Sequence, residues 1–205
     1  MIKPLAGARR HLNVETLAPV PGRNPSQMLE EVLTFWFKDI EPKNRWSPDL
    51  EFDALLRQRF LGLLEQASVG ELYAWRSSAR GRLAEVVVLD QFSRNIYRNT
   101  PRAFAQDAVA LVLSQEAVAA GALVELPSEQ WAFLLMPYMH SESRLIHVQA
   151  EVLFREFAPA ETLEFELRHK AIIDRFGRYP HRNRILGRLS TEEETEFLEQ
   201  PGSGF

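Results

Sequence analysis

The densest group of chemically active side chains in this sequence is the segment from Asp174 to Arg188. It holds five arginines and one histidine against a single acid, although the whole chain carries a net charge of −4. Aromatic residues, glycines and a proline lie between these charges, which is typical of a fixed backbone and not of a solvated basic tail. Because the planar guanidinium group matches carboxylate and phosphate oxygens, the segment predicts a site for an anion.

A second polar group lies in the segment from Arg82 to Tyr97. Apolar residues recur there at intervals of three and four, which predicts a helix in spite of the β-branched run at residues 86–88. Asp90 shares the apolar face, so we expect it to point inward and to be paired, since an ionised carboxylate alone in a core is untenable. Asp90 either forms a buried ion pair with Arg94, one turn later, or orients Arg94 or Arg98 toward a ligand.

Two neighbouring residues, His140 and Glu142, are candidates for proton transfer. They follow Pro137, which should kink or end a helix, and side chains at such a break can face a cavity. The structural alternative is that Ser141 or Ser143 caps the next helix, with Glu142 in its first turn.

Two further histidines accompany the basic segment. His169 lies on an apolar helical stripe just before it, so this imidazole is either a hydrogen-bonded core group or part of the site. His181 lies within the segment itself. Since an unperturbed imidazole titrates near about pH 6.5, a histidine beside several arginines could serve as an acid or a base.

The elements that must position these side chains are predicted to be helices. Starts are indicated at Asn24-Pro25, at Ser47-Pro48 and at Thr100-Pro101, and the residues from Ser190 to Glu193 form a capping box. Gly177 is expected to end a helix over residues 160–176. No strand pattern and no repeat of 20–50 residues emerges, so the sequence predicts an all-α fold of about eight to ten helices.

The domain boundaries follow from the same patterns. Residues 1–23 have scattered apolar residues and several prolines, and we expect an irregular N-terminal extension there. Residues 24–200 are predicted to form one all-α domain, followed by a loose tail at residues 201–205.

Composition excludes several kinds of site. The chain has no cysteine, so disulfides, thiolate metal sites and cysteine nucleophiles are ruled out, and the default compartment is the cytoplasm. No apolar run approaches the roughly 18 residues of a membrane span. Neither a metal-binding HExxH motif nor a glycine-rich phosphate loop is present, so we expect no metal and no cofactor. A pI near 5.8 disfavours nucleic acid as a partner.

Three motifs together resemble a known family. They are Leu89–Arg98, His140–Glu142 and Arg175–Asn183, and Leu186–Glu193 follows them. Over residues 27–198 the chain is similar to the bacterial family called domain of unknown function 924. The resemblance implies an all-α fold similar to tetratricopeptide-like helical arrays and no established activity. The polar positions that recur in the family correspond here to Asp90, Gln91, Arg94, Asn95, Arg98, His140, Glu142, His169, Arg178, His181, Arg182 and Asn183.

Two functions compete at this stage. In the first, the clusters converge on an anionic small molecule, and the chemistry could be hydrolytic or group-transfer. The candidate catalytic residues are His140, Glu142 and His181. The candidate ligand-binding residues are Asp90, Gln91, Arg94, Asn95, Arg98, His169, Arg178, Arg182 and Asn183. On this hypothesis Arg178→Ala should abolish anion binding with little change in helix content.

The second function is a helical-array scaffold that clamps an acidic peptide or protein partner. RNA binding through the arginine-rich segment would need a wide basic face, and the acidic total argues against it. A purely structural polar core is the remaining reading. The sequence alone decides neither enzymatic activity nor oligomeric state.

Overall fold

The helix signals of the sequence are matched by helices in the structure, a computed structural model that describes residues 24–46 and 48–204. The α-helices are α1 (Pro25–Thr34), α2 (Leu50–Ser68), α3 (Ala79–Val87), α4 (Ser93–Ile96), α5 (Asp107–Ala119), α6 (Ala122–Glu125), α7 (Ser128–Met139), α8 (Arg144–Phe157), α9 (Ala160–Phe176) and α10 (Glu192–Leu198). π-Helical turns occur at Phe35–Asp39 and Val88–Phe92, and 3₁₀ turns at Pro42–Arg45, Tyr73–Ser77, Pro101–Phe104 and Pro180–Arg182. The described residues contain no strand, so the predicted all-α class is confirmed.

Side-chain caps explain where the first two helices begin. The Asn24 side chain accepts the N–H of Ser26 at 3.0 Å, as the sequence predicts for the start of α1. In α2 the cap is Asp49, whose carboxylate accepts the N–H of Glu51 at 2.9 Å. The predicted cap, Ser47, and the predicted extension at residues 1–23 lie outside the described residues.

Most later helix boundaries agree with the sequence to within a few residues, but the helix predicted to start at Thr100-Pro101 is different: a 3₁₀ turn covers Pro101–Phe104, and α5 begins only at Asp107. Gly177 ends α9 with a left-handed backbone (φ 70°), a conformation that glycine adopts without steric cost. The capping box of α10 is formed by Thr191 and Glu194, one residue later than predicted. Pro137 lies inside α7, which continues to Met139.

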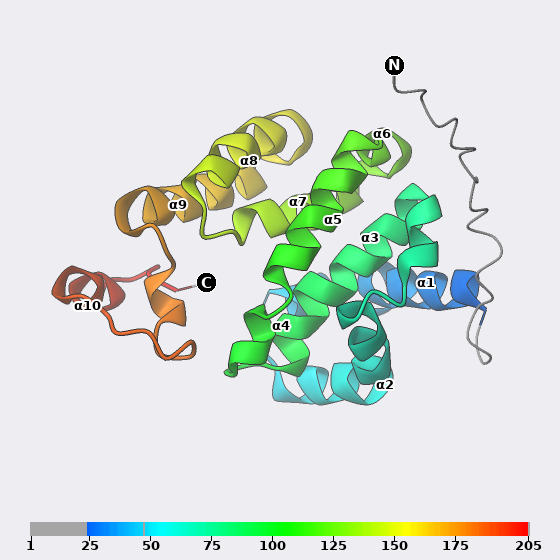
Figure 1. The fold of residues 1–205 in the computed structure, drawn as a ribbon, viewed down its shortest axis with the longest axis horizontal. Helices are drawn as coiled ribbons and strands as arrows, with labels where there is room; N and C mark the ends of the chain where they lie inside the picture. The colour runs from blue at the N-terminus through cyan, green and yellow to red at the C-terminus, as the bar shows by residue number, and fades with distance from the viewer. Residues whose placement is uncertain (1–23, 47, 205) are drawn as a thin grey trace, which may run out of the picture.

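A continuous helical rod passes through the main core. It consists of α3, the π-helical turn Val88–Phe92 and α4, and its Leu83, Val86 and Phe92 side chains are fully buried. α3 packs against α1, α5 and α7, and Figure 1 shows it among these neighbours. Most side chains of this rod are buried, including several polar ones. These polar residues must therefore find partners inside the protein.

The C-terminal part of the chain forms the other end of the molecule (Figure 1). α8 packs against α7 and α9, and the chain then passes through the turn Pro180–Arg182 to α10. A small second core gathers around Ile173 and Tyr179. No helix within the described ranges is both long and apolar enough to cross a membrane.

Candidate functional site

Asp90 is the centre of a polar cluster inside the protein. Its side chain has no exposed surface and lies in the π-helical turn Val88–Phe92. One carboxylate oxygen is 2.8 Å from Nδ1 of His140 and 3.1 Å from Nη1 of Arg94, and the other accepts the Gln91 amide at 2.5 Å. Burial opposes ionisation, but the charge of Arg94 and the contact with His140 outweigh it and hold the pKa of Asp90 well below its usual range.

His140 follows the last residue of α7 and meets Asp90 through Nδ1. Burial and the charge of Arg94 lower the pKa of His140, although Asp90 opposes the shift. The imidazole is therefore neutral near pH 7, and the contact with Asp90 assigns its proton to Nδ1. Nε2 makes no hydrogen bond to any other described residue, and 15% of the side chain is exposed. No other described residue uses the lone pair of this nitrogen.

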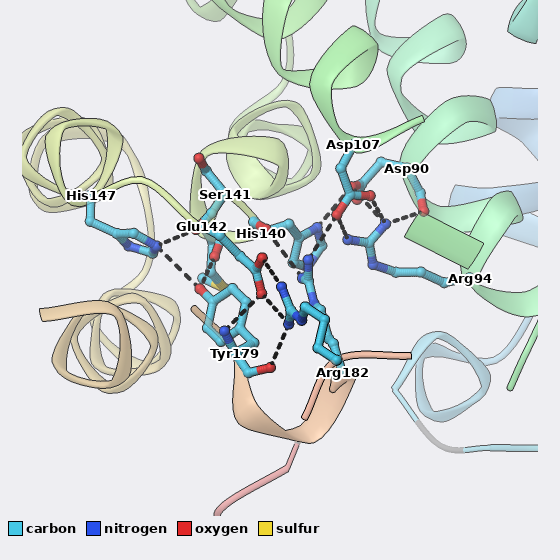
Figure 2. A network of polar contacts seen from close by, with 11 residues as sticks. Asp90, Arg94, Asp107, His140, Ser141, Glu142, His147, Tyr179 and Arg182 are labelled. Atoms are coloured by element: carbon cyan, nitrogen blue, oxygen red, sulfur yellow. Dashed lines mark hydrogen bonds and ion pairs between the residues drawn. The ribbon is translucent and has the colours of Figure 1, made fainter. Parts of the chain in front are cut away.

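Asp107 joins two arginines beside this histidine. As the first residue of α5, it binds Arg94 with both oxygens, at 3.0 and 3.1 Å, and accepts Nη1 of Arg182 at 3.0 Å. Arg182 also donates to the backbone carbonyl of His140 at 3.1 Å. Figure 2 shows Asp90, Arg94, Asp107, His140 and Arg182 in one connected network. We call these five residues the Asp90–Arg182 cluster.

The C-terminal segment brings Arg182 to the cluster from a distant part of the chain. After Gly177 reverses the direction of α9, the Tyr179 N–H donates to Glu142 at 2.8 Å. Arg188 binds both oxygens of the same Glu142, at 2.5 and 2.9 Å, and the Tyr179 hydroxyl donates to the carbonyl of Met139 at 2.5 Å. These contacts fix the turn Pro180–Arg182 against the end of α7, and Figure 2 shows Glu142 facing this turn.

The structure brings four predicted site residues together, Asp90, Arg94, His140 and Arg182, with Gln91 in direct contact with Asp90. Other predicted residues lie elsewhere. Arg98 binds Asp53 of α2 with two hydrogen bonds, at 2.5 and 2.8 Å, and Asn95 accepts a hydrogen bond from Arg98. These two residues tie α4 to α2 and do not reach His140.

Arg178 is also separate from the cluster. It binds both oxygens of Glu194 at 2.6 and 2.7 Å, and Asn183 donates to the same carboxylate at 3.2 Å. The expectation that Arg178 joins Arg94 and His140 in one hollow is therefore not met, because α10 supplies a carboxylate that holds Arg178 at the C-terminal end of the molecule. Arg182, four residues later, takes the place beside Arg94 and His140 that was expected of Arg178.

The remaining histidines pack around Tyr179. The His169 ring lies 5.7 Å from the Tyr179 ring, and Nδ1 contacts the carbonyl of Phe165 at 2.7 Å. Burial lowers the pKa of His169 to about 3. The His181 ring lies 5.5 Å from that of Tyr179, and burial together with the charge of Arg182 lowers the pKa of His181 to about 4. Both imidazoles are neutral near pH 7.

Sequence reasoning missed Asp107 and a buried pair formed by His147 and Glu166. His147 Nδ1 lies 2.8 Å from Glu166, and its Nε2 is 2.9 Å from the carbonyl of Ser141, next to His140. Both side chains are fully buried, and burial raises the pKa of Glu166. The available signal for His147 was its position on the same face of α8 as the apolar residues Ala150 and Phe154. Asp107 had no such signal, because the sequence put the start of its helix at Thr100-Pro101.

No three His, Asp or Glu side chains are grouped to hold a metal ion within the part of the chain that the structure describes. The chemistry that the cluster itself offers is of two kinds. A neutral imidazole held by a buried carboxylate can take up a proton, and two neighbouring guanidinium groups can stabilise negative charge.

Comparisons with known proteins agree with the family resemblance. The family model described as "Bacterial protein of unknown function (DUF924)" matches residues 32–202. A solved structure of a protein of unknown function from Agrobacterium tumefaciens is similar, with a TM-score of 0.82 and 31% sequence identity. The similarity covers 86% of this chain and 99% of that one. No curated protein matches the chain significantly.

Proposed function

We propose that this chain, which belongs to the DUF924 family of bacterial proteins of unknown function, binds a small molecule with an anionic group and acts on it by acid–base catalysis at His140. The observation that carries the proposal is the state of the His140 ring. A buried carboxylate holds its Nδ1 at 2.8 Å, while Nε2 has no hydrogen bond to the other described residues. Two guanidinium groups, those of Arg94 and Arg182, lie in the same network.

Each residue then has a distinct task. Nε2 of His140 accepts a proton from water or from a hydroxyl group of the ligand. Asp90 is ionised and stabilises the imidazolium that forms, because the carboxylate lies directly on Nδ1. Arg94 and Arg182 hold the anionic group and stabilise the charge that develops on the reacting oxygen. Hydrolysis and group transfer both need this combination.

The scaffold for an acidic peptide is the weaker candidate. A peptide clamp needs charged side chains along an open surface, whereas Asp90 is fully buried and Arg182 is 7% exposed. Within the acid–base proposal the catalytic role belongs to His140, while Glu142 and His181 help to position the turn that carries Arg182. The tetratricopeptide-like arrangement and the cytoplasmic location suggested by the sequence stay predictions.

A ligand screen with matched variants tests the proposal. Small carboxylates and phosphate esters are screened by thermal shift on the wild-type protein, and the affinity of each hit is measured by calorimetry. Arg182→Gln should weaken binding about tenfold or more, because the anionic group loses a charged donor, and His140→Gln should weaken the binding of hits with a hydroxyl group, because that group loses Nε2 as its acceptor. Arg178→Gln is the control and should leave the affinity unchanged, because Arg178 is bonded to Glu194.

The screen can also contradict the proposal. If no compound binds, or if every hit loses as much affinity in Arg178→Gln as in Arg182→Gln, the Asp90–Arg182 cluster is a structural polar core.

A further inference from the structure

The carboxylate of Asp107 has an unusual position for a side chain at a helix start. It lies between two guanidinium groups, with both oxygens on Arg94 and one of them also on Arg182. By comparison, the pair of Asp53 with Arg98 joins one carboxylate to one arginine. Two converging guanidinium groups are the arrangement that binds a carboxylate or phosphate group of a ligand most strongly.

Arg182 has a single carboxylate partner among the described residues. Asp107 is the carboxylate that binds its side chain, and it is shared with Arg94. Burial and the neighbouring charge of Arg94 lower the pKa of Arg182. Its Nε–H is buried and has no acceptor within the described part of the chain. Since natural proteins leave few such donors unsatisfied, Arg182 retains capacity for a further acceptor.

Of the two carboxylates in the cluster, Asp107 is the one that can leave more easily. Its side chain is 18% exposed, whereas Asp90 has no exposed surface. Asp107 belongs to the first turn of α5, where a carboxylate facing solvent is still favoured by the helix dipole. Rotation toward water would therefore cost Asp107 less than it would cost Asp90.

We propose that Asp107 occupies an oxyanion subsite, and that the carboxylate or phosphate group of the ligand replaces it between Arg94 and Arg182. This inference rests on the proposed function and specifies its ligand class. The displaced Asp107 turns to solvent, and the remainder of the ligand lies beside Nε2 of His140. In the absence of ligand, the Asp107 carboxylate keeps the two guanidinium groups oriented and prevents their mutual repulsion.

Chemical rescue of Asp107→Asn tests this inference, with Asp53→Asn as the matched control. Thermal midpoints are measured in sodium chloride, sodium phosphate and sodium acetate at equal ionic strength. Asp107→Asn should be less stable than the wild type in chloride, and phosphate or acetate should raise its midpoint by about 4 °C at tenfold excess over Kd. Asp53→Asn is also expected to lose stability, but the oxyanions should shift it no more than they shift the wild type.

Each outcome decides the inference. Selective rescue by phosphate, by acetate or by both supports it and identifies the oxyanion. Equal responses of Asp107→Asn and Asp53→Asn overturn it. If Asp107→Asn does not fold in chloride, helical circular dichroism after refolding replaces the midpoint, and phosphate or acetate must restore it in Asp107→Asn and not in a comparably unfolded Asp53→Asn.

The result is separable from the test of the proposed function. Rescue of Asp107→Asn without any ligand that depends on His140 would support the subsite and contradict acid–base catalysis. A ligand that depends on His140, together with no selective rescue, would leave the proposed function standing and place the anionic group elsewhere.

Discussion

Asp90→Asn is expected to lower the free energy of unfolding by about 3 kcal/mol. The carboxylate is fully buried and is contacted by Arg94, His140 and Gln91. An amide keeps one acceptor oxygen but presents an N–H₂ group to a second donor, so at least one buried donor loses its acceptor. Arg94 also loses part of its charge compensation, although Asp107 still binds it.

Urea denaturation of wild type and variant measures this effect, and Glu30→Gln is the control. Glu30 binds Arg80 with two hydrogen bonds, at 2.6 and 2.9 Å, but both side chains are about half exposed. An exposed pair contributes at most about 1 kcal/mol. A loss below about 0.5 kcal/mol for Asp90→Asn would mean that Asp90 is not an ionised partner of Arg94 and His140.

Acidification from pH 7 to pH 5 should lower the free energy of unfolding by several kcal/mol. His169 and His181 have folded-state pKa values of about 3 and about 4, whereas an unfolded histidine titrates near about 6.5. Between these values the unfolded chain binds protons that the folded protein does not, so stability falls as the pH falls. By linkage each of the two histidines contributes about 2 kcal/mol to this loss at pH 5.

Other groups also have shifted pKa values, and the direction of each shift tells whether the group adds to the loss of stability or opposes it. The pKa of His140 is also lowered, so His140 adds to the loss. The pKa of Glu166 is raised by burial, so the folded protein binds a proton at Glu166 more readily than the unfolded chain does. This group therefore opposes the loss of stability. The carboxylates with lowered pKa, such as Glu194 at about 2, lose their stabilising effect only at lower pH.

Urea denaturation at pH 7.5, 6 and 5 measures the slope. His181→Gln should remove roughly half of the loss that His169 and His181 cause together, because glutamine does not titrate. A stability that stays constant or rises between pH 7 and pH 5 would show that these imidazoles are accessible to protons in the folded state.

Local patterns in the sequence were enough to predict most of the α-helices and the inward direction of Asp90. Asn24 and Gly177 mark helix ends through short-range effects, a capping side chain and a left-handed backbone, which are visible in a few neighbouring residues. Asp90 was predicted on the apolar face shared with Leu83 and Val86, and all three side chains are fully buried. The pairing with Arg94 follows from helical spacing.

The composition of the Asp90–Arg182 cluster depends on contacts that no local pattern records. Arg178 and Arg182 are equally plausible by type and spacing, and the choice is made by Glu194, which binds Arg178. Asp107 comes from a separate helix, 75 residues before Arg182, and its sequence surroundings are ordinary. Glu142 was predicted as catalytic, but its oxygens are used by Arg188 and the Tyr179 N–H, partners that only the fold of the C-terminal segment brings near.

Nitrogen-15 NMR of the His140 imidazole tests the central claim most directly. The signals are assigned by their loss in His140→Gln, and the chemical shifts of the two ring nitrogens report which one carries a proton. We predict a neutral ring at pH 7 with the proton on Nδ1, a free lone pair on Nε2 and a pKa below about 6.5. A ring that is protonated at pH 7, or that carries its proton on Nε2, would contradict the assignment of His140 as a base.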